Sequence, residues 1–137
     1  MALTHLLDSS VLTRLHHAAV RDVVEPAAER GEFARAGISD LEIGYSARNA
    51  AEWDRLSEAL QAFELVETTD DHLRRARQVQ RMLAAKHQRG RKVPDLLIAA
   101  AAESRGLIVL HYDADFDLIA SVTGQGCEWV VPAGSVD

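Results

Sequence analysis

Acidic side chains are the residues best suited to chemistry in this sequence, because several of them follow apolar segments typical of buried strands. They are Asp8, Glu42, Asp113 and Asp115, with Asp95 at the start of a later helix-forming segment. In an open parallel sheet, such positions gather at the carboxyl ends of the strands, where ligand sites form. Two carboxylates 4 Å apart repel by about 4 kcal/mol at an effective dielectric of about 20, and a protein relieves this by raising a pKa or binding a cation. Oxygen ligands favour Mg²⁺ or Mn²⁺ over zinc, so the pattern indicates a site for a hard divalent cation.

Each of these acids also has a structural interpretation. Asp8 is able to cap a helix, and Asp95 suits the positive N-terminal end of one. Ser39 and Glu42 fit a capping box, with serine first and glutamate three residues later. For Glu42, and for Asp117 as a helix cap, the structural role is the simpler interpretation. For Asp8 and Asp95 the residues alone leave both interpretations open.

Positive charge is concentrated in one segment although the chain is acidic overall, with 21 acids, 15 bases and a net charge of −6. The segment 74–92 contains no acid and eight bases, which are Arg74, Arg75, Arg77, Arg81, Lys86, Arg89, Arg91 and Lys92. A solvated helix face explains any one of them, whereas the block as a whole suits an anionic partner equally well. A hard cation beside a basic helix is the combination that phosphodiester hydrolysis needs, because the ion activates water and the bases hold the backbone.

Other catalytic arrangements have little support in the sequence. The lone Cys127 excludes an internal disulfide framework and a cysteine-based zinc site. The six histidines show neither metal-ligand spacing such as HExxH nor pairing with a serine in a nucleophile elbow. The sequence has no glycine-rich phosphate loop, and His111, which follows a predicted strand, is more simply explained as a packed side chain.

The spacing of apolar residues predicts an α/β fold with more helix than strand. Short apolar runs predict strands at 4–7, 34–38, 63–67, 107–110 and 128–131. Helical spacing and capping signals predict two helices within 11–30 and further helices over 39–49, 52–62, 69–90, 94–105 and 113–120. The helix that begins after Thr69 presents an inward stripe of Leu73, Ala76, Val79 and Leu83. Strands that alternate with helices indicate a central parallel sheet covered on both faces.

Length and composition are those of a globular protein of one domain. The 137 residues are close to the commonest domain size, so we expect a single domain over 1–137. The hydrophobic fraction of 47% is ordinary for a folded protein and too high for a disordered one. No run approaches the roughly 18 apolar residues of a membrane span, and no signal peptide is visible. We therefore expect a cytoplasmic protein that does not associate with a membrane.

Four segments carry a resemblance to a known family. They read LLDSSVL at 6–12, ISDLE at 38–42, VPDLLIAA at 93–100 and HYDADF at 111–116. In this order and spacing they resemble a PIN-domain ribonuclease and, within that family, the VapC toxins of bacterial VapBC toxin–antitoxin pairs. The resemblance implies a PIN-like three-layer α/β/α sandwich and a Mg²⁺- or Mn²⁺-dependent endoribonuclease. It also implies a homodimer, held inactive by a VapB antitoxin, that cleaves loops of tRNA or rRNA and so inhibits translation.

The resemblance also implies roles for individual residues. By position, the catalytic quartet is Asp8, Glu42, Asp95 and Asp113. The metal ligands are Asp8, Asp95, Asp113 and Asp115. We assign RNA binding to Ser9, Arg74, Arg77, Arg81, Arg89, Arg91 and Lys92, where Ser9 matches a small hydroxyl residue that orients the first carboxylate or a metal-bound water. Many relatives carry Asn where this chain has Ser10, so a polar contact near the site is lost or replaced.

Non-catalytic functions are the main alternative. A receiver-like regulatory domain also gathers acids around Mg²⁺, but it needs a lysine after its last strands, and here Lys86 and Lys92 both precede the strand 107–110. A dehalogenase-like phosphatase needs a DxD motif after the first strand, whereas Asp8 is followed by two serines. A PIN-like module that acts only as a scaffold is a third alternative, which the presence of all four acids makes less attractive.

Overall fold

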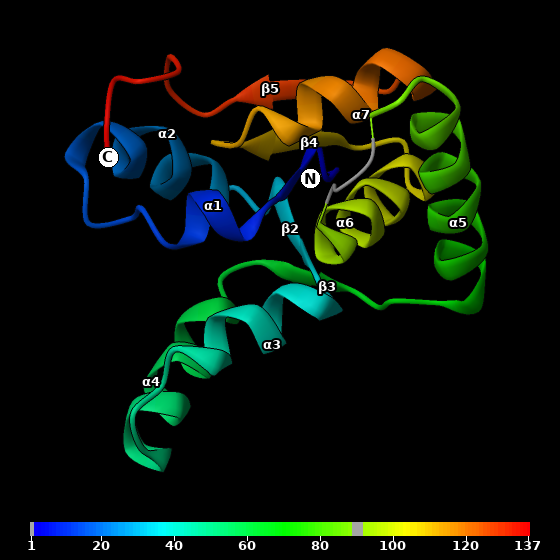
Figure 1. Cartoon of the computed structure of the whole chain (residues 1–137). Helices are drawn as coiled ribbons and strands as arrows, with labels where there is room; N and C mark the ends of the chain where they lie inside the picture. The colour runs from blue at the N-terminus through cyan, green and yellow to red at the C-terminus, as the bar shows by residue number, and fades with distance from the viewer. Residues whose placement is uncertain (1, 89–91) are drawn as a thin grey trace.

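A central sheet of five parallel strands organises the protein, in a computed structural model that describes residues 2–88 and 92–137. The strands are β1 (His5–Leu7), β2 (Phe33–Ala36), β3 (Glu64–Val66), β4 (Ile108–His111) and β5 (Cys127–Trp129). Their order across the sheet is β3-β2-β1-β4-β5, so β1 and β4 lie next to each other at its centre (Figure 1). The predicted parallel sheet is confirmed, and the carboxyl ends of all five strands point to one edge.

Helices flank the sheet on both faces, as the sequence predicts for a three-layer α/β/α sandwich. Within the described residues they are α1 (Ser9–Leu12), α2 (Ala18–Glu29), α3 (Gly37–Tyr45), α4 (Ala50–Leu60), α5 (Asp70–Ala85), α6 (Val93–Ser104) and α7 (Asp115–Thr123). One apolar core joins the sheet to α5, α6 and α7, and a second joins its other face to α1 and α2. Helices α3 and α4 pack on each other and project from the side of the sheet (Figure 1). None of the helices in the described chain combines the length and hydropathy needed to cross a bilayer.

The apolar character of β1 and β4 follows from their central position. Leu6 pairs in register with Ala34 on β2 and Val109 on β4, and all three side chains are fully buried. Because both faces of these strands are covered by helices, consecutive apolar residues occur there instead of alternation, with a histidine at the start of β1 and at the end of β4. The two strands thereby hold rigidly the residues that follow them at the carboxyl edge.

Two helix predictions are wrong in detail. Thr69 caps α5 as predicted, but Leu73 is 49% exposed while its neighbour His72 is buried. His72 is the third helical residue and completes the capping box, and its Nε2 lies 3.0 Å from Ser104 Oγ on α6. The buried face of α5 therefore begins with His72 in place of Leu73. The predicted end of this helix at Gly90 lies outside the described residues, and α5 ends at Ala85.

The predicted capping box at Ser39 is also wrong. Strand β2 ends at Ala36 and α3 begins at Gly37, so Ser39 lies within the first helical turn instead of before it. The Ser39 side chain is fully buried, and the first turn of α3 has no side-chain cap. The same helix ends at Tyr45, not near Asn49, because Asn49 caps α4 by accepting the backbone N–H of Glu52 at 2.9 Å.

Candidate active site

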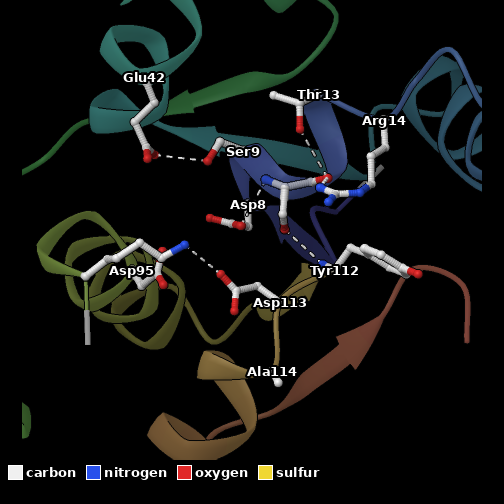
Figure 2. Close-up of a pocket in the computed structure, with 11 residues that line it drawn as sticks. Asp8, Ser9, Thr13, Arg14, Glu42, Asp95, Tyr112, Asp113 and Ala114 are labelled. Atoms are coloured by element: carbon white, nitrogen blue, oxygen red, sulfur yellow. Dashed lines mark hydrogen bonds and ion pairs between the residues drawn. The ribbon is translucent and has the colours of Figure 1, made fainter. Parts of the chain in front are cut away.

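A pocket of about 470 Å³ opens at the carboxyl edge of β1 and β4, and Figure 2 shows the side chains that line it. Its acidic lining residues are Asp8, Glu42, Asp95 and Asp113. They come from the end of β1, from α3, from the start of α6 and from the turn after β4. The fold thus brings together carboxylates that are up to 105 positions apart in the chain (113 minus 8).

Asp8 is almost completely buried at the end of β1, with 2% of its surface exposed. Its Oδ2 accepts the backbone N–H of Ser10 at 3.0 Å and so caps the short helix α1. Its Oδ1 is buried and has no hydrogen-bond partner in the described part of the chain. Burial raises the pKa of Asp8. The structural interpretation of Asp8 is therefore confirmed for one oxygen, which caps a helix, while the other oxygen has no partner among the described residues.

Asp95 lies in the first turn of α6 and is 3% exposed. Its Oδ2 is a second buried carboxylate oxygen without a partner among the described residues. Burial, followed by the negative charge of Asp8, raises the pKa of Asp95 to about 7. A carboxylate in this position is costly in the metal-free protein, and a nearby cation would restore its ordinary acidity.

Asp113 is held by hydrogen bonds in the turn between β4 and α7. Its Oδ1 accepts the backbone N–H of Asp115 and its Oδ2 accepts Lys92 Nζ, both at 2.9 Å. Burial favours the neutral form of Asp113, but these hydrogen bonds outweigh it and lower the pKa. Asp113 is therefore ionised at neutral pH.

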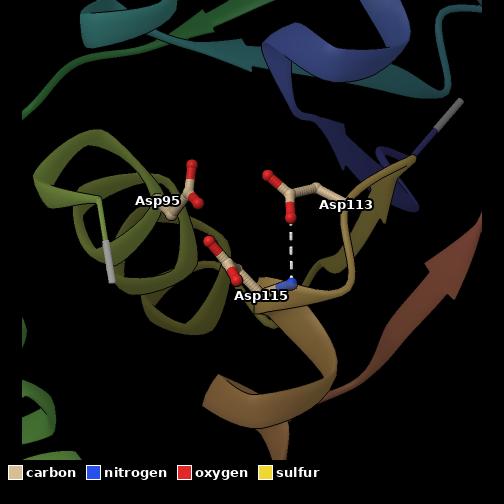
Figure 3. A group of neighbouring side chains, drawn as sticks. All are labelled: Asp95, Asp113 and Asp115. Atoms are coloured by element: carbon tan, nitrogen blue, oxygen red, sulfur yellow. Dashed lines mark hydrogen bonds between the residues drawn. The ribbon is translucent and has the colours of Figure 1, made fainter. Parts of the chain in front are cut away.

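Three aspartates offer a set of oxygens that fits a divalent cation. Asp95, Asp113 and Asp115 each have a carboxylate oxygen within 4.8 Å of the others, and Figure 3 shows how they face one another. The donors are all oxygen, which suits Mg²⁺ or Mn²⁺. The unpartnered oxygens of Asp8 and Asp95 lie in the same pocket, so the residues present fit the ion that the sequence implies.

Glu42 faces the pocket and not the start of its own helix. Its Oε1 accepts a hydrogen bond from Ser9 Oγ at 3.1 Å, across 33 positions of sequence. Burial, followed by the charge of Asp8, raises the pKa of Glu42. The capping role that seemed simpler from the residues alone is thus replaced by a contact inside the site.

Comparison with known proteins agrees with this architecture. The PIN domain model matches residues 5–122. The chain belongs to the PIN-domain family. It is 66% identical to Ribonuclease VapC51 of Mycobacterium tuberculosis over the full length of both chains, and 46% identical to Ribonuclease VapC21 of the same organism over 98% of this chain and 99% of that protein.

Solved structures share the fold of this PIN domain. The VapBC complex of Salmonella typhimurium bound to DNA matches with a TM-score of 0.78 and 19% identity, over 94% of this chain and 99% of that chain. The VapBC-5 complex of Mycobacterium tuberculosis matches with a TM-score of 0.66 and 22% identity, over 93% of this chain and 98% of that chain. The sequence-based recognition of a VapC-type PIN domain is confirmed.

The bases to which RNA binding is assigned in this PIN domain divide, where the structure describes them, between its outer surface and its pocket. Arg77 and Arg81 are exposed on α5, which packs against α6 and α7, and Arg74 on the same helix pairs with Asp71. Lys92 lies in the pocket itself, where it pairs with Asp113. Arg89 and Arg91 lie outside the described residues.

Two further predictions about the PIN domain have clear outcomes. His111 is a packed side chain, as expected, since it is fully buried and its ring lies 5.1 Å from that of Phe116 and 5.0 Å from that of Trp129. Its Nδ1 also accepts the backbone N–H of Asp113 at 3.2 Å, which fixes the acidic turn. The prediction that Asp117 caps α7 is wrong, because its Oδ2 accepts the indole N–H of Trp129 at 3.1 Å.

The sequence analysis missed the pocket residues Arg14 and Tyr112. Ser10 connects this part of the pocket to the sheet, because its Oγ accepts the backbone N–H of Tyr112 at 2.9 Å. The only signal in the sequence is that Arg14 is four residues after Ser10, whose carbonyl it contacts. Because α1 ends at Leu12, before Arg14, a spacing of four residues does not by itself predict that the Arg14 side chain contacts the Ser10 carbonyl.

Proposed function

We propose that this protein is the metal-dependent endoribonuclease toxin of a VapBC toxin–antitoxin pair. The observation that supports this best is the pair of buried, unpartnered carboxylate oxygens on Asp8 and Asp95, in the pocket that Asp113 also lines. Burying carboxylate oxygens without partners costs several kcal/mol, which a bound cation would offset. The 66% identity to a protein named Ribonuclease VapC51 supports RNA as the substrate.

Mg²⁺ or Mn²⁺ is the proposed cofactor, with Asp8, Asp95, Asp113 and Asp115 as the residues that hold it. When bound, such an ion supplies activation of a water molecule and stabilisation of negative charge on the phosphate. Asp113 is already ionised and oriented by Lys92 and the Asp115 N–H, so it is ready to bind a cation. The raised pKa of Asp95 means that binding also displaces a proton when the pH is below about 7.

Glu42 is the proposed acceptor of the proton from the attacking water. Ser9 holds Glu42 Oε1, which leaves Oε2 to accept that proton. The water oxygen forms a bond to phosphorus as the bond from phosphorus to the 3′-oxygen breaks, and a proton passes to that leaving oxygen. The products are a 5′-phosphate and a 3′-hydroxyl, and Ser9 acts as a positioning residue.

RNA binding outside the pocket is assigned to the exposed bases of the segment 74–92. Arg77 and Arg81 are exposed on α5 and form no ion pair within the described residues, while Arg74 shares its charge with Asp71. Arg89 and Arg91 complete the assigned set. Lys92 contributes to the site through Asp113. Contacts between these bases and phosphates predict binding that weakens as salt rises. The proposed targets are tRNA or rRNA loops, whose cleavage inhibits translation in the cytoplasm.

The proposed assembly is a homodimer of single PIN-like domains over 1–137, inactivated by a VapB-type antitoxin. The antitoxin partner is supported by solved structures of the same fold, several of which are of VapBC. A receiver-like or scaffold function predicts no RNA cleavage, so activity separates these alternatives.

RNA cleavage by the purified protein tests the proposal. We expect total bacterial RNA to be cut in the presence of Mg²⁺, and cutting to stop with EDTA or with Asp95→Asn. Asp117→Asn is the matched control, because this acid lies outside the pocket lining. Full cutting by a metal-free Asp95→Asn preparation would contradict the assignment.

A further inference from the structure

Two basic side chains line the pocket, and they are held in different ways. Lys92 donates to the carboxylate of Asp113 at 2.9 Å. Arg14 donates through Nη1 to the peptide oxygen of Ser10 at 2.8 Å and through Nε to the backbone oxygen of Asp137, the last residue of the sequence, at 2.9 Å. No acidic side chain within residues 2–88 and 92–137 forms an ion pair with Arg14. We propose that Arg14 binds a phosphate of the RNA strand beside the one that is cleaved.

The guanidinium of Arg14 is fixed in orientation, and some of its N–H groups have no acceptor among the described residues. Its Cζ lies 4.8 Å from the centre of the Tyr112 ring, so the aromatic face supports one side of the cation. The ring is itself anchored, because Tyr112 Oη donates to Val136 O at 2.7 Å and accepts the Val136 N–H at 3.1 Å. Two of the five guanidinium N–H groups bond main-chain oxygens, and three remain for a ligand. An arginine restrained in this way loses little side-chain entropy when it binds.

The position of Arg14 suits a strand that runs across the pocket. Figure 2 shows Asp95 and Asp113 on one side of Asp8 and Arg14 on the other. The acidic side repels phosphates unless a cation is present, whereas the Arg14 side attracts them. Guanidinium groups bind phosphate through paired, charge-assisted hydrogen bonds, which gives both affinity and register. Arg14 would therefore place the RNA backbone so that the next phosphate lies among the carboxylates.

Arg21 provides a matched control within the same part of the chain. Its Nη1 also donates to main-chain oxygens, to Leu15 O at 3.1 Å and His16 O at 2.9 Å. Like Arg14 it is half-buried, but it does not line the pocket. Replacing Arg21 removes the same charge and the same kind of hydrogen bond, so it reports what a merely structural loss does.

The test measures binding of a short fluorescein-labelled single-stranded RNA by anisotropy at several KCl concentrations, with Ca²⁺ in place of Mg²⁺ and the RNA checked for integrity. Arg14→Gln is expected to weaken binding about tenfold and to reduce the slope of log affinity against log salt by about 0.7. Arg14→Lys keeps the charge and the slope but loses part of the affinity. Near-ultraviolet circular dichroism checks that each variant folds. If Arg14→Gln does not fold, the loss of affinity in Arg14→Lys provides the test. Arg21→Gln is expected to match wild type.

Because this role rests on the ribonuclease function proposed above, the two fail differently. If wild type cleaves RNA but Arg14→Gln binds it with the same affinity and slope as Arg21→Gln, only the Arg14 assignment is overturned. The Arg14 assignment is also overturned if Arg14→Lys binds RNA with wild-type affinity while Arg21→Gln loses affinity. If wild type neither binds nor cleaves RNA, both are overturned.

Discussion

Replacement of Asp95 by Asn should raise the free energy of unfolding of the metal-free protein, and this gain over wild type should increase as pH rises. Asp95 has a pKa of about 7 in the folded protein and about 3.8 in an unfolded chain. A carboxyl group whose pKa is raised by folding stabilises the folded state below its unfolded value, and that contribution is lost as pH rises through the folded value. The side chain of Asn is neutral at every pH, so the variant avoids this loss.

The magnitude follows from the two pKa values. The difference between a pKa of about 7 and one of 3.8 corresponds to up to about 4 kcal/mol in free energy of unfolding at high pH. Between pH 5 and pH 8, the advantage of Asp95→Asn over wild type should grow by about 2–3 kcal/mol. Urea denaturation in EDTA, with matched buffers at each pH, measures this difference directly.

Added Mg²⁺ should favour wild type over Asp95→Asn, the opposite of the order in stability without metal. Mg²⁺ should raise the free energy of unfolding of wild type at pH 8 and leave that of Asp95→Asn nearly unchanged, because a ligand stabilises only a folded state that binds it. If the two metal-free proteins show the same pH dependence, Asp95 is not a costly buried carboxylate, and the electrostatic reasoning for the cation site fails.

Three further predictions concern the site and the core. Ser9→Ala should lower kcat for RNA cleavage about tenfold with little change in KM, because Glu42 loses its positioning bond, and Ser9→Thr should restore most of the rate; full activity in Ser9→Ala would remove Ser9 from the mechanism. Phe116→Ala should reduce the free energy of unfolding by about 3–5 kcal/mol in urea titrations, since this side chain is fully buried under α6, and a loss below about 1 kcal/mol would contradict its place in the core. Thr69→Ala should cost about 1 kcal/mol through loss of the α5 cap, whereas an unchanged urea midpoint would show that the capping box contributes nothing.

The sheet and its acidic edge could be predicted from the sequence because they depend on local patterns. The runs ending at Leu7 and Leu110 close on buried apolar residues, Leu6–Leu7 and Val109–Leu110, which is typical of strands covered on both faces. Acids placed within a few residues after such runs are expected at the carboxyl edge, so Asp8 and Asp113 could be brought together without coordinates.

Contacts between distant segments could not be predicted in this way. Glu42 matches the pattern of a local capping box, and only the structure shows that its carboxylate contacts Ser9 instead. Arg14 acquires its orientation from Asp137, 123 positions away, and no periodicity encodes that distance. The exposed position of Leu73 follows from a histidine that completes the cap and turns inward, a use of His72 that helical spacing alone does not indicate.

Anomalous diffraction from crystals grown with Mn²⁺ tests the central claim most directly, because it locates the cation without reference to activity. We predict a strong peak in contact with carboxylate oxygens of Asp95 and Asp113, close to the unpartnered oxygen of Asp8, and the loss of that peak in Asp95→Asn crystals. Fully loaded crystals with Mn²⁺ bound only elsewhere, or a pocket that holds no ion at saturating Mn²⁺, would contradict the account.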